Sequence, residues 1–282
     1  MNNSIAVLLT CFNRREKTIS CLDALFKSQL PAQFAMSVFL VDDGSTDGTS
    51  EAVKSNFPQV HLIEGSGSLF WNQGMRLAWE NASKKSEHDF FIWLNDDTIL
   101  TEYAIADLYE CYKEVLQNYK RHAIVTGACK IADNKNEFSY GGRTDEGPVI
   151  PNGRLQQCKF INGNIVLIPK AVFETIGNLS PDYTHGMGDF DYGLRAIQKG
   201  FECFTTKRYV AVCAKNPAIQ GWHNPDISLK KRWQLLHSPN GLNLKEYNTF
   251  RRKFWKKTWI IYAIKAYAKS LFPRVYNKIT YS

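Results

Sequence analysis

Two pairs of neighbouring acids, Asp42-Asp43 and Asp96-Asp97, each follow a run of apolar residues. Short runs of β-branched and aromatic residues, bounded by polar turn formers, predict buried strands. In an open α/β sheet, ligands bind at the carboxyl ends of the strands. Adjacent carboxylates repel one another and cost stability unless a hydrogen-bonding ligand or a hard cation compensates them. A nucleotide diphosphate with a divalent metal ion would supply both, so the two pairs predict a site of this kind.

The elements that must position these acids alternate along the chain. From residue 5 to about residue 127, apolar runs alternate with segments of helical periodicity, which predicts βαβ units and a mixed, mainly parallel sheet flanked by helices. Asn, Gly and Pro are frequent between residues 131 and 163, where we expect hairpins and loops. We therefore expect an α/β domain over residues 1–224 and a basic, aromatic-rich helical extension over residues 225–282.

The extension carries most of the positive charge of the chain. From Lys230 to Ser282 there are 13 Lys or Arg residues and one acid, Glu246, so a chain of net charge +8 is left with −4 before Lys230. Charged and aromatic residues alternate here, and no uncharged run reaches the roughly 20 residues needed to span a bilayer. This pattern favours a basic amphipathic helix on an anionic membrane surface. A solvated helix that packs its aromatic residues on the main domain fits equally well. Nucleic acid is not expected as a partner, because no nucleic-acid motif accompanies the charge.

The cysteines and the first residues of the chain indicate in which cellular compartment the protein is expected. The seven cysteines are odd in number and show no Cys-x-x-Cys spacing, which favours a reduced setting. Residues 1–4 lack the basic start of a signal peptide, and the apolar run from Ile5 to Leu9 is too short for its core. We expect a cytoplasmic protein, peripheral on the inner face of the cell membrane if the extension binds lipid.

Four segments together carry a family resemblance. They are residues 10–14 (TCFNR), 41–49 (VDDGSTDGT), 94–97 (LNDD) and 188–195 (GDFDYGLR). In this order and spacing they resemble the family-2 inverting nucleotide-sugar glycosyltransferases of GT-A fold, over residues 5 to about 225. The resemblance implies a GT-A (Rossmann-like) sheet and a donor that is a nucleotide diphosphosugar. The combination is far more specific than any one segment.

By this resemblance, the first two segments bind the nucleoside. Thr10, Phe12 and Arg14 would surround the base, and Asp43 would accept the imide hydrogen of a uracil or thymine ring. The chemistry agrees, since an ionised carboxylate is a strong acceptor for such an N–H donor. Asp42 is expected instead to stabilise the turn by accepting hydrogen bonds from nearby amides.

The segment at residues 94–97 resembles the D-x-D motif of the family with Asn95 in its first position. Asp96 would then face the ribose and Asp97 would ligate Mn²⁺ or Mg²⁺. These hard cations prefer oxygen ligands and often keep only one or two protein carboxylates, so one retained Asp suffices. The alternative is that the acids cap a following helix, because Thr98 is itself a good cap.

Asp189 is the residue we predict as the general base. Inversion at the anomeric carbon needs an acceptor hydroxyl that attacks opposite the leaving nucleotide while a carboxylate removes its proton. Gly188 stands where the family usually has Glu. Asp191 lies about 200° further around a helix and is expected to pair with Arg195 at i+4. The alternative is that both acids only favour a helix N-terminus.

Segment 66–76 corresponds to a stretch that contributes to donor binding in the family. Gly67 would allow the backbone to approach closely, and Asn72 or Arg76 could reach phosphate or sugar. The position of Trp71, in the core or at the donor, is left open.

Two later segments supply weaker candidates. Residues 160–164 resemble the segment of small residues that lies below the sugar and acceptor site in the family. By this resemblance Asn162 and Gly163 are candidates for contacts with the sugar. His223 follows the last strand region, where relatives often place a metal-binding His, and a neutral imidazole suits Mn²⁺.

The leading functional hypothesis is inverting, metal-dependent transfer of a sugar, hexosyl or deoxyhexosyl, from a UDP- or dTDP-sugar to a saccharide or lipid-linked acceptor. Family and extension together suggest cell-surface polysaccharide synthesis. One alternative is a sugar-phosphate nucleotidyltransferase, although such enzymes open with a Gly-rich, basic loop that residues 10–14 do not provide. Another is a catalytically silent, membrane-associated module that binds nucleotide sugars.

Overall fold

The computed structural model describes residues 3–132, 137–216 and 221–281 and divides into two compact units. The first unit comprises Met1–Leu179 and Asp189–Lys215, and the second comprises Ser180–Gly188 and Asn216–Ser282. This division falls nine residues before the boundary expected at 224/225, and it assigns the short segment 180–188 to the second unit.

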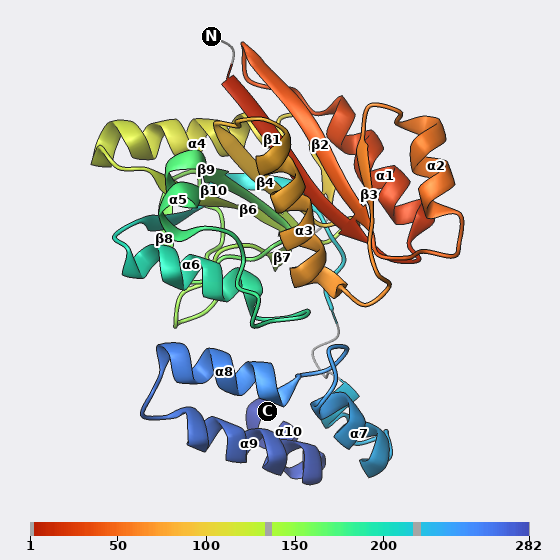
Figure 1. Cartoon of the computed structure of the whole chain (residues 1–282). Helices are drawn as coiled ribbons and strands as arrows, with labels where there is room; N and C mark the ends of the chain where they lie inside the picture. Colours follow the sequence, from red (N-terminus) through yellow and green to blue (C-terminus); the bar gives the residue numbers. More distant parts are fainter. Residues whose placement is uncertain (1–2, 133–136, 217–220, 282) are drawn as a thin grey trace. The chain divides into compact units, whose positions relative to one another are not determined.

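The first unit is an α/β unit with ten strands and six helices among its described residues (Figure 1). The strands are β1 (Asn3–Cys11), β2 (Phe34–Asp42), β3 (His61–Glu64), β4 (Phe90–Leu94), β5 (Ile99–Leu100), β6 (Ala123–Lys130), β7 (Phe138–Tyr140), β8 (Gln156–Cys158), β9 (Ile165–Pro169) and β10 (Glu202–Val212). The helices are α1 (Arg15–Lys27), α2 (Thr49–Asn56), α3 (Phe70–Lys85), α4 (Ala104–Tyr119), α5 (Lys170–Ile176) and α6 (Gly188–Gln198), which starts on the last residue of the second unit's short segment.

All ten strands join one sheet. Its order is β3-β2-β1-β4-β9-β6-β10-β5, with β7 on β6 and β8 on β10. Strands β1 to β4, β6 and β10 run in one direction, while β9, β5, β7 and β8 are antiparallel to their neighbours. The mixed, mainly parallel sheet predicted from the alternating pattern is confirmed, and the later strands supply the antiparallel part.

Helices cover both faces of the sheet, because successive strand residues point to opposite sides. Ile5, Val7 and Leu9 of β1 belong to a core cluster with residues of α1, α2 and α4. Ala6 and Leu8 belong to another cluster with residues of α3, α5 and α6. All five residues of β4 are buried, as expected for a strand between two helical layers. Burial on both faces fixes the register of β1, β2 and β4, and so fixes where their loops begin.

The second unit is helical in its described residues. It contains the short 3₁₀ helix η1 (Gly221–His223) and helices α7 (Leu229–Leu236), α8 (Leu244–Phe254), α9 (Trp259–Leu271) and α10 (Pro273–Tyr281). Trp222, Leu236, Leu244 and Ala266 form its small core. Among the described residues, no helix is both long enough and apolar enough to cross a membrane.

Hydrogen bonds fasten this unit internally. Arg232 of α7 is buried and donates from Nε to the carbonyl oxygen of Ser270 at 2.8 Å, at the end of α9. The short segment 180–188 is held by Glu246 of α8, which accepts from the backbone N–H of Thr184 at 2.9 Å and from its hydroxyl at 2.5 Å. This pair explains why the segment groups with the C-terminal helices.

Candidate active site

The parallel neighbours β2, β1 and β4 end at the same edge of the sheet, and their loops carry the predicted acids. Arg14, after β1, reaches both acids after β4. Its Nη1 atom donates to Oδ1 of Asp96 at 2.9 Å and to Oδ2 of Asp97 at 3.0 Å. The loop after β1 is also tied to the loop after β2, because the backbone N–H of Asn13 donates to the Ser45 hydroxyl at 2.9 Å. Sequence segments far apart in the chain thus meet at one edge.

Asp96 and Asp97 differ in environment. Asp96 is only 5% exposed, and burial raises its pKa to about 6 although Arg14 opposes the rise. Its Oδ2 atom is buried and has no hydrogen-bond partner among the described residues, whereas the Asp97 side chain is 26% exposed. The alternative that these acids cap a following helix is wrong, because β5 follows them and the next helix, α4, begins only at Ala104.

The two carboxylates fit a divalent cation of the hard type. Oxygen donors suit Mg²⁺ and Mn²⁺, and a guanidinium cation already lies between the two side chains. One buried carboxylate oxygen, Oδ2 of Asp96, finds no hydrogen-bond partner in the parts of the chain that the structure describes. In the described part of the chain no group of three or more His, Cys, Asp or Glu could hold a metal, so phosphate and water would have to complete the shell. His223 is buried in the second unit, and its role as a ligand stays a prediction.

The carboxylate of Asp43 accepts hydrogen bonds from three backbone amides. Its Oδ1 accepts from Gly67 at 2.8 Å, and its Oδ2 accepts from Leu69 at 2.7 Å and from Phe70 at 3.0 Å. Gly67 has a φ of +84°, and Phe70 has a φ of +55°, which is unusual for a bulky residue. Asp43 therefore shapes the loop between β3 and α3. Sequence reasoning assigned it to the base and missed this role.

The other nucleoside candidates lie at the same edge. Phe12 is 50% exposed, so its ring is free to stack on a base. Thr10 packs against α3, where a Cβ on Gly74 would lie 2.2 Å from the Thr10 hydroxyl oxygen. Asp42 accepts from the backbone N–H of Ser45 at 2.9 Å and from the Ser50 hydroxyl. The prediction that Asp42 stabilises the turn is confirmed.

A polar network under the acids joins three elements. The indole N–H of Trp71 donates to Oδ1 of Asn95 at 2.7 Å, and Nδ2 of Asn95 donates to Oδ1 of Asn164 at 3.1 Å. Gly163 lies against the Trp71 ring, since a Cβ there would come within 2.3 Å of Cζ2. Asn162 accepts from the N–H of Asn164 at 3.2 Å. Asn95 is thus part of the scaffold, and the position of Trp71, left open by the sequence, is beside the candidate site.

Asp189 reaches the same network from the start of α6. Its Oδ2 accepts the backbone N–H of Gly163 at 3.1 Å, and its Oδ1 accepts that of Phe190 at 2.8 Å. Burial raises its pKa to about 6, and these two amides counter part of the rise. A carboxylate whose pKa is raised towards physiological pH is suited to accept a proton there. The structure therefore brings Asp189 to Gly163, which precedes Asn164, the residue that accepts from Asn95.

The two donor ligands predicted on α3 lie in different surroundings. Arg76 donates to the carbonyl oxygen of Leu179 at 2.8 Å and to Glu80 at 2.9 Å, and Asn72 is fully buried in the first turn of α3. The guanidinium of Arg76 is thus engaged by its own helix and by residue 179, while the roles of Asn72 and Arg76 at the donor stay predictions. Sequence reasoning could not distinguish them from exposed residues of the same helix.

The pair predicted at i, i+4 on α6 is present. Arg195 donates from Nε to Oδ2 of the fully buried Asp191 at 2.6 Å. The same guanidinium donates to the carbonyl oxygens of Ile176 at 2.7 Å and Asn178 at 3.0 Å. Asp191 is therefore a structural partner of Arg195, and it fixes the chain near residue 178.

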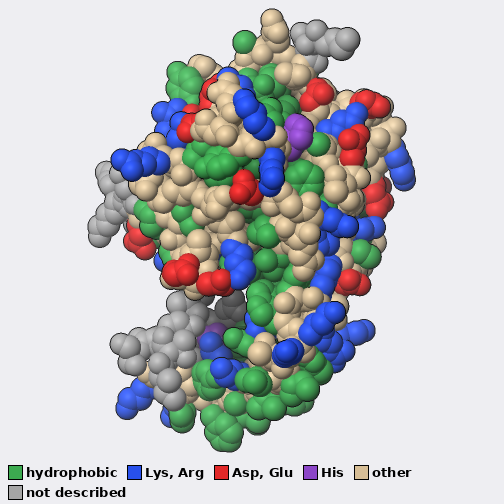
Figure 2. All heavy atoms as spheres, turned by 90° about the vertical axis from the view of Figure 1, so that its left-hand side faces the viewer, with side chains coloured by type: hydrophobic (Ala, Val, Ile, Leu, Met, Phe, Trp, Pro, Cys, Tyr) green, Lys and Arg blue, Asp and Glu red, His purple; other side chains and the backbone are tan. Residues whose placement is uncertain are grey.

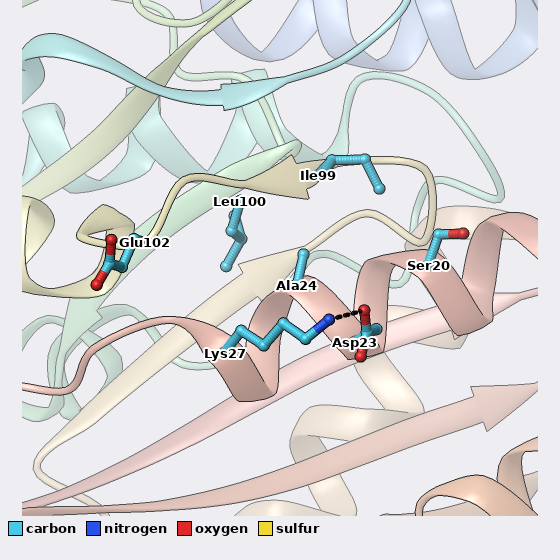
Figure 3. A pocket seen from close by; sticks show the side chains of 7 residues that line it. All are labelled: Ser20, Asp23, Ala24, Lys27, Ile99, Leu100 and Glu102. Atoms are coloured by element: carbon cyan, nitrogen blue, oxygen red, sulfur yellow. Dashed lines mark hydrogen bonds and ion pairs between the residues drawn. The ribbon is translucent and has the colours of Figure 1, made fainter.

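A surface pocket between α1 and β5 lies apart from these residues (Figure 3). Its lining includes Asp23 and Lys27, which pair with each other at 2.6 Å along α1, and Glu102. None of the predicted site residues lines it. The candidate site is the polar edge after β1, β2 and β4 together with the start of α6.

Comparisons with known proteins agree with this geometry. One similar solved structure is a mannosyltransferase from Pyrobaculum calidifontis in complex with GDP-Man and Mn²⁺, with a TM-score of 0.56 and 15% identity, over 96% of this chain and 76% of the other. Another is TarS residues 1–349 from S. aureus in complex with UDP-GlcNAc, with a TM-score of 0.55 and 13% identity, over 92% of this chain and 73% of the other. At these identities the likeness shows the fold.

A match to a family model shows the protein family to which the chain belongs. No match was found among curated protein sequences. The model for glycosyl transferase family 2 matches residues 6–176, which is more than half of the chain and includes both acidic pairs but not Asp189. With the GT-A fold confirmed by the sheet and its structural neighbours, the chain belongs to glycosyl transferase family 2.

Proposed function

We propose that the protein is an inverting, metal-dependent glycosyltransferase. It would move a hexosyl or deoxyhexosyl group from a UDP- or dTDP-sugar to a saccharide or lipid-linked saccharide acceptor, in cell-surface polysaccharide synthesis. The observation that carries the proposal is a set of hydrogen bonds beyond the ends of the parallel strands. Arg14 binds both Asp96 and Asp97, and Asn95, which precedes them, binds Asn164. Asp189 binds Gly163, the neighbour of Asn164 in the chain. Neighbours bind GDP-Man or UDP-GlcNAc, so they support a nucleotide-sugar donor without deciding its base.

Donor binding is assigned to the loops after β1, β2 and β4. The exposed ring of Phe12 would stack on the base, while Thr10 and the loop held by Asp43 would form the wall beside it. Asp96 would face the ribose, and Asp97 would hold Mn²⁺ or Mg²⁺. A bound metal ion neutralises charge that develops on the leaving diphosphate. Arg14, which pairs with both acids, would be released towards the phosphates.

Proton transfer is assigned to Asp189. Its carboxylate is positioned by the amides of Gly163 and Phe190, so it needs little reorientation before it accepts the proton of the attacking hydroxyl. A retaining mechanism would need no such base. Stereochemical analysis of the product by NMR, with inversion expected, tests this part directly.

The donor is tested by thermal unfolding with a panel of UDP-, dTDP- and GDP-sugars, with and without Mn²⁺. A ligand that binds only the folded state raises the melting temperature. At a ligand concentration of 100 times its Kd, the free energy of unfolding increases by about 2.7 kcal/mol. We expect shifts with UDP- or dTDP-sugars that grow when Mn²⁺ is present and that Asp97→Ala abolishes. A shift with GDP-sugars alone would overturn the donor assignment.

The two alternatives predict other products. A sugar-phosphate nucleotidyltransferase would release pyrophosphate from a nucleoside triphosphate, whereas a glycosyltransferase releases a nucleoside diphosphate from its donor. A silent binding module would show the thermal shifts without any hydrolysis or transfer. We expect slow, Mn²⁺-dependent release of nucleoside diphosphate from the donor that fits.

A cytoplasmic position on the inner face of the membrane is part of the proposal. A lipid-linked acceptor would be presented there, and the basic extension gives the protein a means to reach it.

A further inference from the structure

Large apolar side chains are exposed along α9 and the start of α10. Ile260 is 54% exposed, Ile264 is 63%, Phe272 is 64% and Val275 is 62%. Ile260, Ile264 and Leu271 lie on one face of α9, because they are four and eleven residues apart in a helix of 3.6 residues per turn. Phe272 follows the end of α9, and Val275 belongs to the separate helix α10. We call the exposed apolar side chains of these two helices and their junction the apolar strip and define it as Ile260, Ile261, Ile264, Leu271, Phe272 and Val275.

The strip is not the part of α9 that stabilises the second unit. Ala266 and Ser270, one turn apart, are the residues that α9 buries, at 5% and 0% exposure. A helix that packs on a soluble core normally buries its large apolar residues and exposes its small and polar ones. Here the small residues face the core and the isoleucines face outward. Exposed apolar patches of this kind mark interaction sites rather than ordinary surface.

Positive charge surrounds the strip. Arg252, Lys256, Lys257, Lys265 and Arg274 are exposed on or beside the same helices. Figure 2 shows hydrophobic side chains gathered on the helices of the second unit, with Lys and Arg side chains beside them. The single acid after Lys230, Glu246, offsets only one of the 13 positive charges, which leaves this segment at +12.

We propose that the apolar strip and its basic border are a docking surface for an anionic phospholipid membrane, on which α9 lies parallel to the surface. The aliphatic residues would enter the boundary between headgroups and acyl chains, while Lys and Arg contact the headgroups. This surface does not depend on the reaction proposed above, because it lies wholly within the second unit.

The chemistry favours lipid over two other occupants. A second copy of the chain would bring a segment of net charge +12 against an identical one, which opposes association. Nucleic acid would satisfy the charge, but it stacks on aromatic rings and offers no apolar phase for Ile260, Ile261 and Ile264. Only a lipid surface takes up both the aliphatic strip and the cations.

Vesicle flotation with the full chain tests the proposal. We expect binding to vesicles with 30% phosphatidylglycerol in phosphatidylcholine and at least tenfold weaker binding to pure phosphatidylcholine. Binding should weaken as salt rises from 0.05 to 0.5 M, since the screening length falls from about 14 Å to about 4 Å over this range. Equal binding to both vesicle types would overturn the electrostatic half of the proposal.

Matched variants separate the two contributions. Lys256→Gln with Lys257→Gln should weaken binding roughly 30-fold, from about 1 kcal/mol per basic residue, whereas Lys54→Gln with Lys84→Gln should leave it unchanged. Ile260→Ser with Ile264→Ser should weaken binding at least tenfold. The control pair is Ile150→Ser with Ile197→Ser, which are exposed in the first unit.

Three results would overturn the assignment. The first is full binding by the Ile260/Ile264 variant, with an unfolding temperature equal to that of the parent chain. The second is a dimer in sedimentation analysis that this variant converts to a monomer, because the strip would then be an interface between copies. Retention of a short duplex RNA that competes with the vesicles and is lost in the lysine variant alone would point to nucleic acid instead.

Discussion

Asp43 accepts the backbone N–H of Phe70 at 3.0 Å, and Phe70 has a left-handed backbone with φ of +55°. A bulky residue adopts this conformation only where its surroundings impose it. The carboxylate also accepts from Gly67 and Leu69, so one buried side chain determines the path by which the chain enters α3. The Asp43 carboxylate thus fixes the loop beside the proposed donor site.

Asp43→Asn should lower the free energy of unfolding by about 1–3 kcal/mol. The amide has a single acceptor oxygen, so its NH₂ group would face a backbone N–H that Asp43 now satisfies. Chemical denaturation measures the loss. Asp145→Asn, which removes an exposed charge paired with Lys159, is the control and should cost less than about 1 kcal/mol. Unchanged stability with weaker UDP binding would favour a direct contact of Asp43 with the base instead.

Asp189→Asn should reduce transfer by a factor of about 10² to 10⁴ while nucleotide-sugar binding persists, because only the proton acceptor is lost. Single-turnover kinetics and calorimetry measure the two quantities separately. Asp191→Asn makes the matched comparison, since Asp191 pairs with Arg195 and should affect stability more than the chemical step. Loss of donor binding in Asp189→Asn would show that the carboxylate positions the donor.

The pH dependence of transfer should report the raised pKa of Asp189. The base must be ionised to accept a proton, so kcat/KM should rise tenfold per pH unit below about 6 and level off above it. Burial is the main cause of the shift, so the profile should be nearly insensitive to salt. A break near pH 4, the range of an ordinary carboxyl group, would contradict the assignment.

Gly163→Ala should disturb the site without removing any functional group. The added Cβ would lie 2.3 Å from Cζ2 of Trp71, so the indole or the loop must move. Because Gly163 also donates to Asp189, we expect a lower melting temperature and a lower kcat together. Gly153→Ala is a poor control because of its positive φ, whereas Gly186, which has open space around it, is a suitable one. Normal kcat in Gly163→Ala would show that the Trp71 contact is dispensable.

Arg14→Ala should strengthen the binding of Mn²⁺ alone by about two- to fivefold, because the guanidinium no longer competes for Asp96 and Asp97. Arg14→Lys, which keeps a cation, should bind Mn²⁺ as the parent chain does. Electron paramagnetic resonance of free Mn²⁺ measures the affinities. Weaker binding in Arg14→Ala would mean that Arg14 organises the carboxylates for the metal rather than occupying their place.

Periodicity and motif order predicted much of this molecule. Strand ends, the central parallel strands and the i, i+4 pair of Asp191 and Arg195 follow from patterns that local physics makes visible in a sequence. The turn role of Asp42 was also predictable, because it involves amides only three residues away. The alternating pattern up to about residue 127 was enough to predict a mainly parallel sheet, whereas the GT-A fold was predicted from the resemblance of four segments to a family.

Contacts between segments far apart in the chain could not be predicted from periodicity and motif order. Asp43 accepts hydrogen bonds from the loop at residues 67–70, and Arg76 donates to the carbonyl oxygen of Leu179. Both interactions depend on how the chain packs in three dimensions and not on spacing in the sequence. The repulsion between Asp96 and Asp97 was interpreted as a requirement for a ligand. In the structure Arg14, from a loop more than 80 residues earlier, already neutralises part of it.

The passage of the chain between its two units has a consequence for how the protein can be dissected. The chain crosses from one unit to the other three times, after residues 179, 188 and 215. The middle segment ends next to Asp189, and Glu246 of the C-terminal helices holds it at Thr184. A shortened chain that stops before α8 would therefore release the lead-in to the proposed base as well as the basic helices. Loss of activity after such a truncation would not by itself measure the contribution of the membrane surface.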